Sequence, residues 1–170
     1  MKVTVRDATD DDLPATLAIY DQLVDETTVT WAWERETPAD RQAVWDERRR
    51  RGFPVLVAVD EGTGEVVGYG TYSDFRDSLS KPGYRFTAEH TIHVRQDRTG
   101  EGIGPVLLDA LIERARAAGI HIMVAGVDGE NEGSIRFHER HGFVETARMP
   151  EIGFKFGRWL DLVLLQRTID

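Results

Sequence analysis

The chain has 170 residues, of which 41% are hydrophobic and 30% are charged, and its formal net charge at pH 7 is −9. This length and composition predict one soluble domain over residues 1–170. The sequence contains no cysteine, which excludes disulfides, thiolate metal sites and a cysteine acyl-enzyme. The negative charge argues against nucleic acid or a membrane as a partner, because both attract a cationic face. No apolar run is long enough to span a membrane and the first residues follow a strand pattern, so we expect a cytoplasmic protein.

Strand-like segments, rich in β-branched residues and bounded by turn residues, occur at 3–6, 55–60, 65–72, 87–94, 121–127, 143–152 and 158–169. Apolar residues at helical spacing predict helices from 10 to 24, from the N-cap Thr37 to about Arg51, from 103 to about 118, and from Asn131 to a stop at Gly142. The order of these elements combines hairpins with one strand-helix-strand crossover. It predicts an α/β fold with a mixed sheet of about seven strands and about four helices on its two faces.

A strand, a glycine loop and a helix follow one another in residues 87–114. Gly100, Gly102 and Gly104 stand at alternate positions before the helix, so the backbone there can approach a ligand closely. The first N–H groups of a helix have no partner within it, which makes this junction a candidate anion site. A dinucleotide or P-loop nucleotide site also uses such a loop. No Lys-Ser or Lys-Thr follows the glycines, and the preceding strand is half polar, so both nucleotide sites are disfavoured.

Four arginines flank the glycine loop and the later helix, namely Arg95, Arg98, Arg136 and Arg140. In a chain of negative net charge they would supply local cations for an anionic ligand. Taken singly, each is explained equally well as a solvated surface arginine.

Residues 99–104 resemble the pyrophosphate loop of the GNAT acetyltransferase superfamily, and residues 131–143 resemble its second motif. Further segments are similar, in type and order, to the phosphinothricin acetyltransferase branch of that superfamily: 28–31, 87–91, 136–139 and 153–161. The resemblance extends from about Arg6 to Gln166. The loop departs from the family pattern at Thr99, where Gln or Arg is usual, and at Glu101, which is often basic or neutral.

The resemblance implies a GNAT-like fold in which the central strands splay and form a cleft for acetyl-CoA, the co-substrate. It also implies an N-acetyltransferase that moves the acetyl group to the amino group of a small amino acid or analogue, by direct attack in a ternary complex. A homodimer is implied as well, with the last strands and residues 27–36 near the interface. The cofactor-binding residues implied by the resemblance are Ile92, His93, Val94, Thr99, Gly100, Glu101, Gly102, Ile103, Gly104, Asn131 and Ser134.

Glu89 and His138 are the candidate catalytic residues. Partial burial of Glu89 on its apolar and Thr-rich strand would raise its pKa toward that of a general base. The pattern alone slightly favours a solvent-facing carboxylate, and the resemblance, in which the matching glutamate is catalytic, reverses that preference. His138 stands where this branch replaces the usual tyrosine acid by histidine, to protonate the thiolate or contact the substrate; the alternative is an ordinary exposed helix histidine. Asn131 suits a helix N-cap and, by resemblance, a pantetheine contact, and these two roles are compatible.

The resemblance assigns the substrate side of the site to Trp31, Arg76, Tyr84, Arg85 and Lys155. Cations in these regions suit an amino acid with a second acidic or polar group. The pattern alone favours core filling over pocket lining for Trp31. The choice of substrate is open among phosphinothricin, methionine sulfoximine or sulfone, and another small amine.

No metal is expected at the histidines. His138 and His141 are three positions apart but no third ligand follows, and His90 and His93 lie on opposite faces of a strand. Two other classes of protein fit part of the pattern, a non-catalytic acyl-CoA sensor and a nucleotide-binding domain. The presence of both Glu89 and His138 argues against the sensor.

Overall fold

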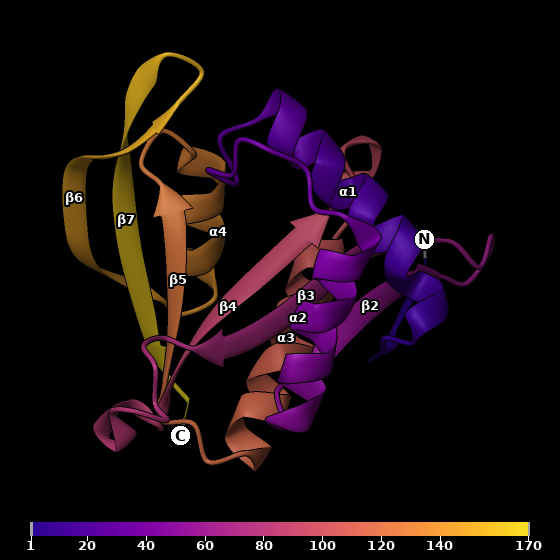
Figure 1. Cartoon of the computed structure of the whole chain (residues 1–170), viewed down its shortest axis with the longest axis horizontal. Coiled ribbons are helices and arrows are strands. Elements are labelled where there is room, and N and C mark those ends of the chain that lie inside the picture. The colour runs from indigo at the N-terminus through magenta and orange to yellow at the C-terminus, as the bar shows by residue number, and fades with distance from the viewer. Residues whose placement is uncertain (1, 170) are drawn as a thin grey trace.

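The computed structural model describes residues 2–169, and its strands form one seven-stranded sheet in the order β1-β2-β3-β4-β5-β7-β6 (Figure 1). The strands are β1 (Val3–Asp7), β2 (Val55–Asp60), β3 (Val66–Asp74), β4 (Thr87–Val94), β5 (Ile122–Asp128), β6 (Val144–Lys155) and β7 (Arg158–Thr168). The α-helices are α1 (Leu13–Glu26), α2 (Pro38–Arg50), α3 (Ile103–Ala117) and α4 (Glu132–Arg140). The predicted mixed α/β sheet with four helices is therefore confirmed.

The two central strands part after a short stretch of pairing. β4 and β5 are parallel and paired only from Thr87 to Glu89, opposite Ile122–Val124. β4 continues to Val94 and β5 to Asp128, and Figure 1 shows these two ends diverging. The predicted splay of the central strands is confirmed. Beyond the paired stretch, the backbone groups on the facing edges of β4 and β5 have no strand opposite them, although each strand stays paired on its other edge.

Alternate side chains of β2 divide between the two faces of the sheet. Leu56 and Ala58 pack in the core cluster with α3, whereas Val55 and Val57 pack in the two clusters that α1 contributes to. Successive strand residues point to opposite faces, so this near-continuous apolar strand is covered on both sides. The central sheet is thus a layer between α3 on one face and α1 with α2 on the other.

The N-cap predicted at the start of α2 is observed. The hydroxyl of Thr37 accepts a hydrogen bond from Asp40 N at 3.1 Å, and the backbone N–H of Thr37 donates to the Asp40 carboxylate.

The last hairpin is tighter than expected, since β6 extends to Lys155 rather than ending at 152. Its turn places Phe156 at φ 52° and Gly157 at φ 75°, and two positive φ values suit a two-residue hairpin turn. A phenylalanine at the first of these positions gave no sequence signal for the turn.

No helix within residues 2–169 is long and apolar enough to cross a bilayer.

Candidate active site

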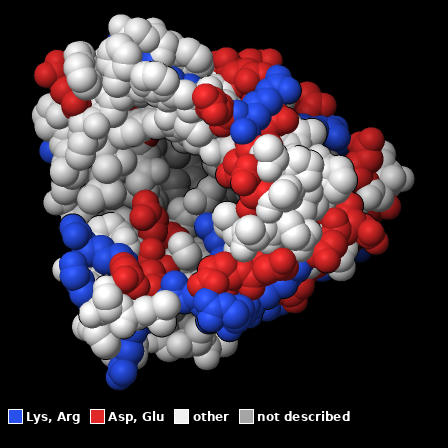
Figure 2. Space-filling view, viewed as in Figure 1, with Lys and Arg blue, Asp and Glu red and all other residues white. Residues whose placement is uncertain are grey.

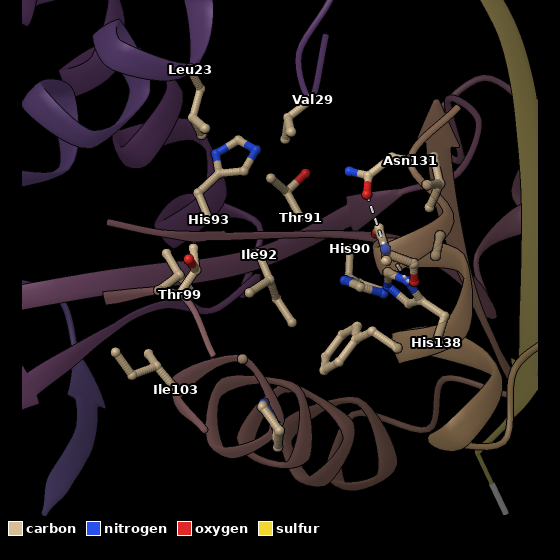
Figure 3. A pocket seen from close by; sticks show the side chains of 18 of the residues that line it. Leu23, Val29, His90, Thr91, Ile92, His93, Thr99, Ile103, Asn131 and His138 are labelled. Atoms are coloured by element: carbon tan, nitrogen blue, oxygen red, sulfur yellow. Dashed lines mark hydrogen bonds between the residues drawn. The ribbon is translucent and has the colours of Figure 1, made fainter. Parts of the chain in front are cut away.

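A cavity of about 730 Å³ occupies the opening between β4 and β5. It is walled by the splayed ends of both strands, the loop before α3, the first turn of α3 and one side of α4. Leu23 of α1 and Val29, from the connection between α1 and α2, close its opposite side. The space-filling view shows the hollow in this face of the molecule, and the close-up shows its lining (Figures 2 and 3).

The glycine loop forms an open cradle at the start of α3. Gly100 and Gly102 have φ values of 80° and 83°, and a Cβ atom added at either glycine would meet no atom within 4 Å. Gly102 is the N-cap of α3, and no side chain caps this helix. Ile103 and Gly104 also line the cavity, so the positive end of the helix dipole faces open space. The geometry suits a phosphate group, which the loop can approach without a side chain in the way.

The two loop residues that depart from the family pattern face neighbouring protein groups. The hydroxyl of Thr99 donates to the carbonyl of Gln96 at 3.0 Å, and the carboxylate of Glu101 accepts from Arg98 Nε at 2.9 Å. Thr99 lines the cavity, whereas Glu101 is absent from its lining. The negative charge of Glu101 is therefore turned toward an arginine rather than into the cradle.

The four arginines near the loop differ in whether they are already paired with carboxylates. Arg95, Arg98 and Arg136 all form ion pairs with carboxylates. Arg140, in the last turn of α4, is exposed, lines the cavity and makes no hydrogen bond or ion pair with residues 2–169. Its charge is thus available to an anionic ligand.

Glu89 sits where β4 and β5 separate. Its side chain is half-buried and makes no hydrogen bond or ion pair with the described part of the chain. A Cβ atom on Gly126 of β5 would lie 3.0 Å from Glu89 Oε1, so the carboxylate occupies space left by the missing side chain. Burial raises the pKa of Glu89 above its ordinary value. A carboxylate with these properties is a candidate proton acceptor.

His138 is buried on α4 with one ring nitrogen already engaged. Its Nδ1 lies 2.7 Å from the carbonyl oxygen of Ser134, and a carbonyl only accepts, so Nδ1 carries a hydrogen and donates. Nε2 is buried and has no partner within residues 2–169. Burial lowers the pKa of His138, which favours a neutral ring whose Nε2 accepts.

His90 is a site residue that the sequence did not single out. It is 6% exposed, both ring nitrogens lack partners among the described residues, and its ring lies 5.1 Å from that of His138. Figure 3 shows these two rings on one side of β4 and His93 on the other. Burial lowers the pKa of His90 to about 3, so the ring is neutral. The sequence did contain a signal for this position. His90 stands two residues from Ala88 and from Ile92, so it shares their inward face of the strand.

The remaining cofactor candidates surround the same space. Ile92, His93 and Val94 line the cavity from the splayed end of β4, and Asn131 and Ser134 line it from the start of α4. The Asn131 side chain accepts from Ser134 N at 3.0 Å, so the N-cap expected there is present. Every cofactor candidate except Glu101 contributes to this one cavity.

The five substrate candidates lie outside that cavity lining, in two places. Arg76, Tyr84 and Arg85 are exposed around the loop after β3, where Arg76 lies over the Tyr84 ring at 5.7 Å. Trp31 and Lys155 lie together at the β6–β7 hairpin, with Trp31 against Gly153 and Lys155 buried. The structure thus does not bring the two groups together around one ligand-sized space.

Within residues 2–169 there is no group of three or more His, Asp or Glu side chains placed to hold a metal ion.

Residues 16–143 match the acetyltransferase (GNAT) family. The chain belongs to this family. It is 49% identical, over 100% of its length and 96% of the relative's, to an L-methionine sulfoximine/L-methionine sulfone acetyltransferase of Pseudomonas aeruginosa. It is 38% identical to a phosphinothricin N-acetyltransferase of Alcaligenes faecalis, covering 98% of this chain and 83% of that protein.

A solved structure shares the fold throughout. The GNAT superfamily phosphinothricin acetyltransferase of Sinorhizobium meliloti, in complex with acetyl-CoA, is 35% identical and superposes with a TM-score of 0.93. The match covers 99% of this chain and 89% of that one. The GNAT fold inferred from the glycine loop and the splayed strands is therefore established for this chain, and it fits acetyl-CoA-dependent N-acetylation.

Proposed function

We propose that this GNAT protein acetylates the amino group of methionine sulfoximine, methionine sulfone or phosphinothricin, with acetyl-CoA as the acetyl donor. The observation that carries the proposal is one cavity bounded by an open glycine cradle and the splayed ends of β4 and β5. Glu89 lies outside the lining of this cavity, at the point where the two strands separate. The names of the relatives, whose lengths match this chain, support the choice of amino-acid analogues.

The cradle and the strand edges fit acetyl-CoA. The N–H groups at Gly102, Ile103 and Gly104 would hold the pyrophosphate, and Arg140 adds a cation at the rim. The backbone groups of Ile92 to Val94 that face away from β3, toward the gap left by β5, would bind the pantetheine amides, with the Val94 N–H directed to the thioester carbonyl. When bound, acetyl-CoA supplies an activated acetyl group as a thioester.

Glu89 acts as the base in this proposal. It accepts a proton from the ammonium group of the substrate, which leaves an amine with a free electron pair for attack on the thioester. Its raised pKa brings it closer to the operating pH than an exposed carboxylate. No acyl-enzyme residue is assigned, so the amine attacks the acetyl group directly.

His138 packs against His90, on the face of β4 opposite to the face that carries Glu89. Glu89 shares its strand face with His93, which contacts Tyr69 and Tyr20 on the α1 side, whereas His138 belongs to α4. With Nδ1 bound to the Ser134 carbonyl, Nε2 is the ring nitrogen that would exchange a proton with the departing sulfur in this proposal. A proton must first reach Nε2 from solvent, because burial keeps the resting ring neutral.

The proposal also includes substrate contacts from Trp31, Arg76, Tyr84 and Arg85, which lie in two separate places outside the cavity lining. The guanidinium groups of the two arginines would bind the acidic or oxidised group of the amino acid. The proposal includes a cytoplasmic homodimer as well. Support for the dimer comes from exposed aromatic side chains that gather at the β6–β7 hairpin and the neighbouring connection, namely Trp33, Phe154, Phe156 and Trp159. Such a patch is typical of a protein interface.

The experiment is an initial-rate measurement of thiol release from acetyl-CoA with the three analogues, their parent amino acids and a polyamine. We expect the highest kcat/KM with one of the analogues and a product acetylated on nitrogen. Acetyl-CoA binding without thiol release in the presence of any amine would overturn the proposal and favour the acyl-CoA sensor.

A further inference from the structure

Lys155, at the end of β6, is a buried cation that forms no ion pair with the described residues, although the charge of Asp25 acts on it from a distance. It is 3% exposed, and no carboxylate of residues 2–169 forms an ion pair with it. Its Nζ donates to the carbonyl oxygens of Thr27 and Thr30, at 2.7 and 2.8 Å. Burying a lysine is unfavourable unless it is well paired, so these two bonds indicate a specific role.

The two carbonyls belong to the connection from 27 to 36, here called the strap, which has no helix or strand. Without regular structure, the strap depends on distant contacts for a fixed conformation. The hairpin supplies them, because Trp33 Nε1 donates to the Phe154 carbonyl at 2.9 Å and the Trp31 ring packs directly on Gly153. The strap places Val29 in the wall of the cavity, opposite the cofactor cradle.

We infer that Lys155 is a positioning residue that fixes the strap across the substrate side of the cleft and so sets the affinity for the amine without contacting it. The inference deepens the proposed function and rests on it for the identity of the amine. It assigns to Lys155 a different role from the substrate contact expected from the sequence. Two of the three ammonium hydrogens are already used by strap carbonyls, and Lys155 does not line the cavity.

The first test is Lys155→Met, which keeps the length of the side chain and removes its donors. We expect KM for the amine to rise by about tenfold or more, the loss typical of hydrogen bonds to a charged group. The Kd for acetyl-CoA should change less than about twofold, because the cradle lies at α3. Lys81→Met, at an exposed lysine outside the strap and the hairpin, is the matched control and should behave as wild type.

Amide hydrogen exchange gives a readout that does not depend on turnover. In Lys155→Met, exchange should accelerate in residues 27–36 and stay unchanged in β4 and α3, whatever amine the enzyme uses. Unchanged exchange in the strap would overturn the inference. If the wild-type enzyme acetylates no amine while the strap still loosens in the variant, the proposed function fails and the structural role of Lys155 stands.

A substrate contact and a positioning role predict different selectivities. If Lys155 bound the carboxylate of the substrate, Lys155→Met would raise KM for amino acids and leave KM for their carboxamides unchanged. The positioning role predicts the same loss for both. Gly153→Ala is a second variant that keeps the lysine, because the added Cβ would overlap the Trp31 ring and displace the strap. It should also raise KM for the amine, and a normal KM in a folded Gly153→Ala protein would contradict the inference.

Discussion

The carboxylate oxygen Oε1 of Glu89 lies 3.0 Å from the point that a Cβ atom on Gly126 would occupy. Glu89 is the last residue of β4 that pairs with β5, and Gly126 stands two residues beyond its partner Val124. The carboxylate thus lies against β5 just beyond the point where the parallel strands separate, at a residue that carries no side chain. A glycine here is favoured by this close approach and not by its φ value.

Gly126→Ala should therefore lower turnover while the protein stays folded. The new Cβ would push the Glu89 carboxylate by a few tenths of an ångström, and a misplaced base slows proton transfer by about tenfold or more. The change is measured as kcat with a saturating amine. Acetyl-CoA affinity and the melting temperature serve as controls, and wild-type kcat in this variant would show that the contact has no part in catalysis.

The unpaired charge of Arg140 leads to a prediction for the cofactor. Arg140→Gln should weaken acetyl-CoA binding by up to about tenfold, and the loss should shrink as salt is raised, because the contact is partly exposed. Arg136→Gln, one helical turn earlier, removes an arginine that already pairs with Glu132 and should leave the Kd unchanged. Titration calorimetry at two salt concentrations measures both. Equal effects of the two substitutions would contradict the assignment.

The pH dependence of kcat should reveal how His138 acts. Glu89 must be ionised to accept a proton, so activity rises as pH increases through its raised pKa. If protonated His138 is the acid, activity must fall again as pH rises through the pKa of His138, which burial lowers from 6.5. If the neutral ring works through solvent, activity stays level above that range and His138→Ala lowers it throughout. A profile identical in wild type and His138→Ala would remove His138 from the mechanism.

Two buried neutral histidines predict a loss of stability in mild acid. Burial lowers the pKa of His90 to about 3 and that of His93 to about 4, from 6.5 in the unfolded chain. The unfolded state therefore binds more protons as pH falls below 6.5, and the free energy of unfolding decreases by up to about 1.4 kcal/mol per pH unit for each histidine. This decrease begins before carboxylates titrate. Urea unfolding between pH 7.5 and 5 measures it, and His90→Phe should reduce the slope; an unchanged slope would mean that His90 does not contribute.

The elements with regular periodicity could be predicted from the sequence, and long-range side-chain placement could not. The glycine loop before α3 and the alternation in β4 are local patterns, so they indicated the element order and a candidate anion site, whereas the splay and the cleft were expected from the family resemblance. Lys155 follows the alternation of a strand, but its partners lie 128 and 125 positions away in the strap. Arg140 resembles its neighbour Arg136 in sequence, and only the folded arrangement of carboxylates distinguishes them.

The role of Glu89 is the central claim, and the comparison of wild type with Glu89→Gln tests it most directly. The measurement is the rate of N-acetyl product formation from methionine sulfone at saturating acetyl-CoA, with acetyl-CoA affinity measured in parallel. We predict a loss of about 100-fold or more in turnover, as expected for removal of a general base, with an unchanged Kd for acetyl-CoA. The variant should melt no lower than wild type, because a half-buried carboxylate without a partner is replaced by a neutral group. Turnover equal to wild type across the pH range would contradict the account.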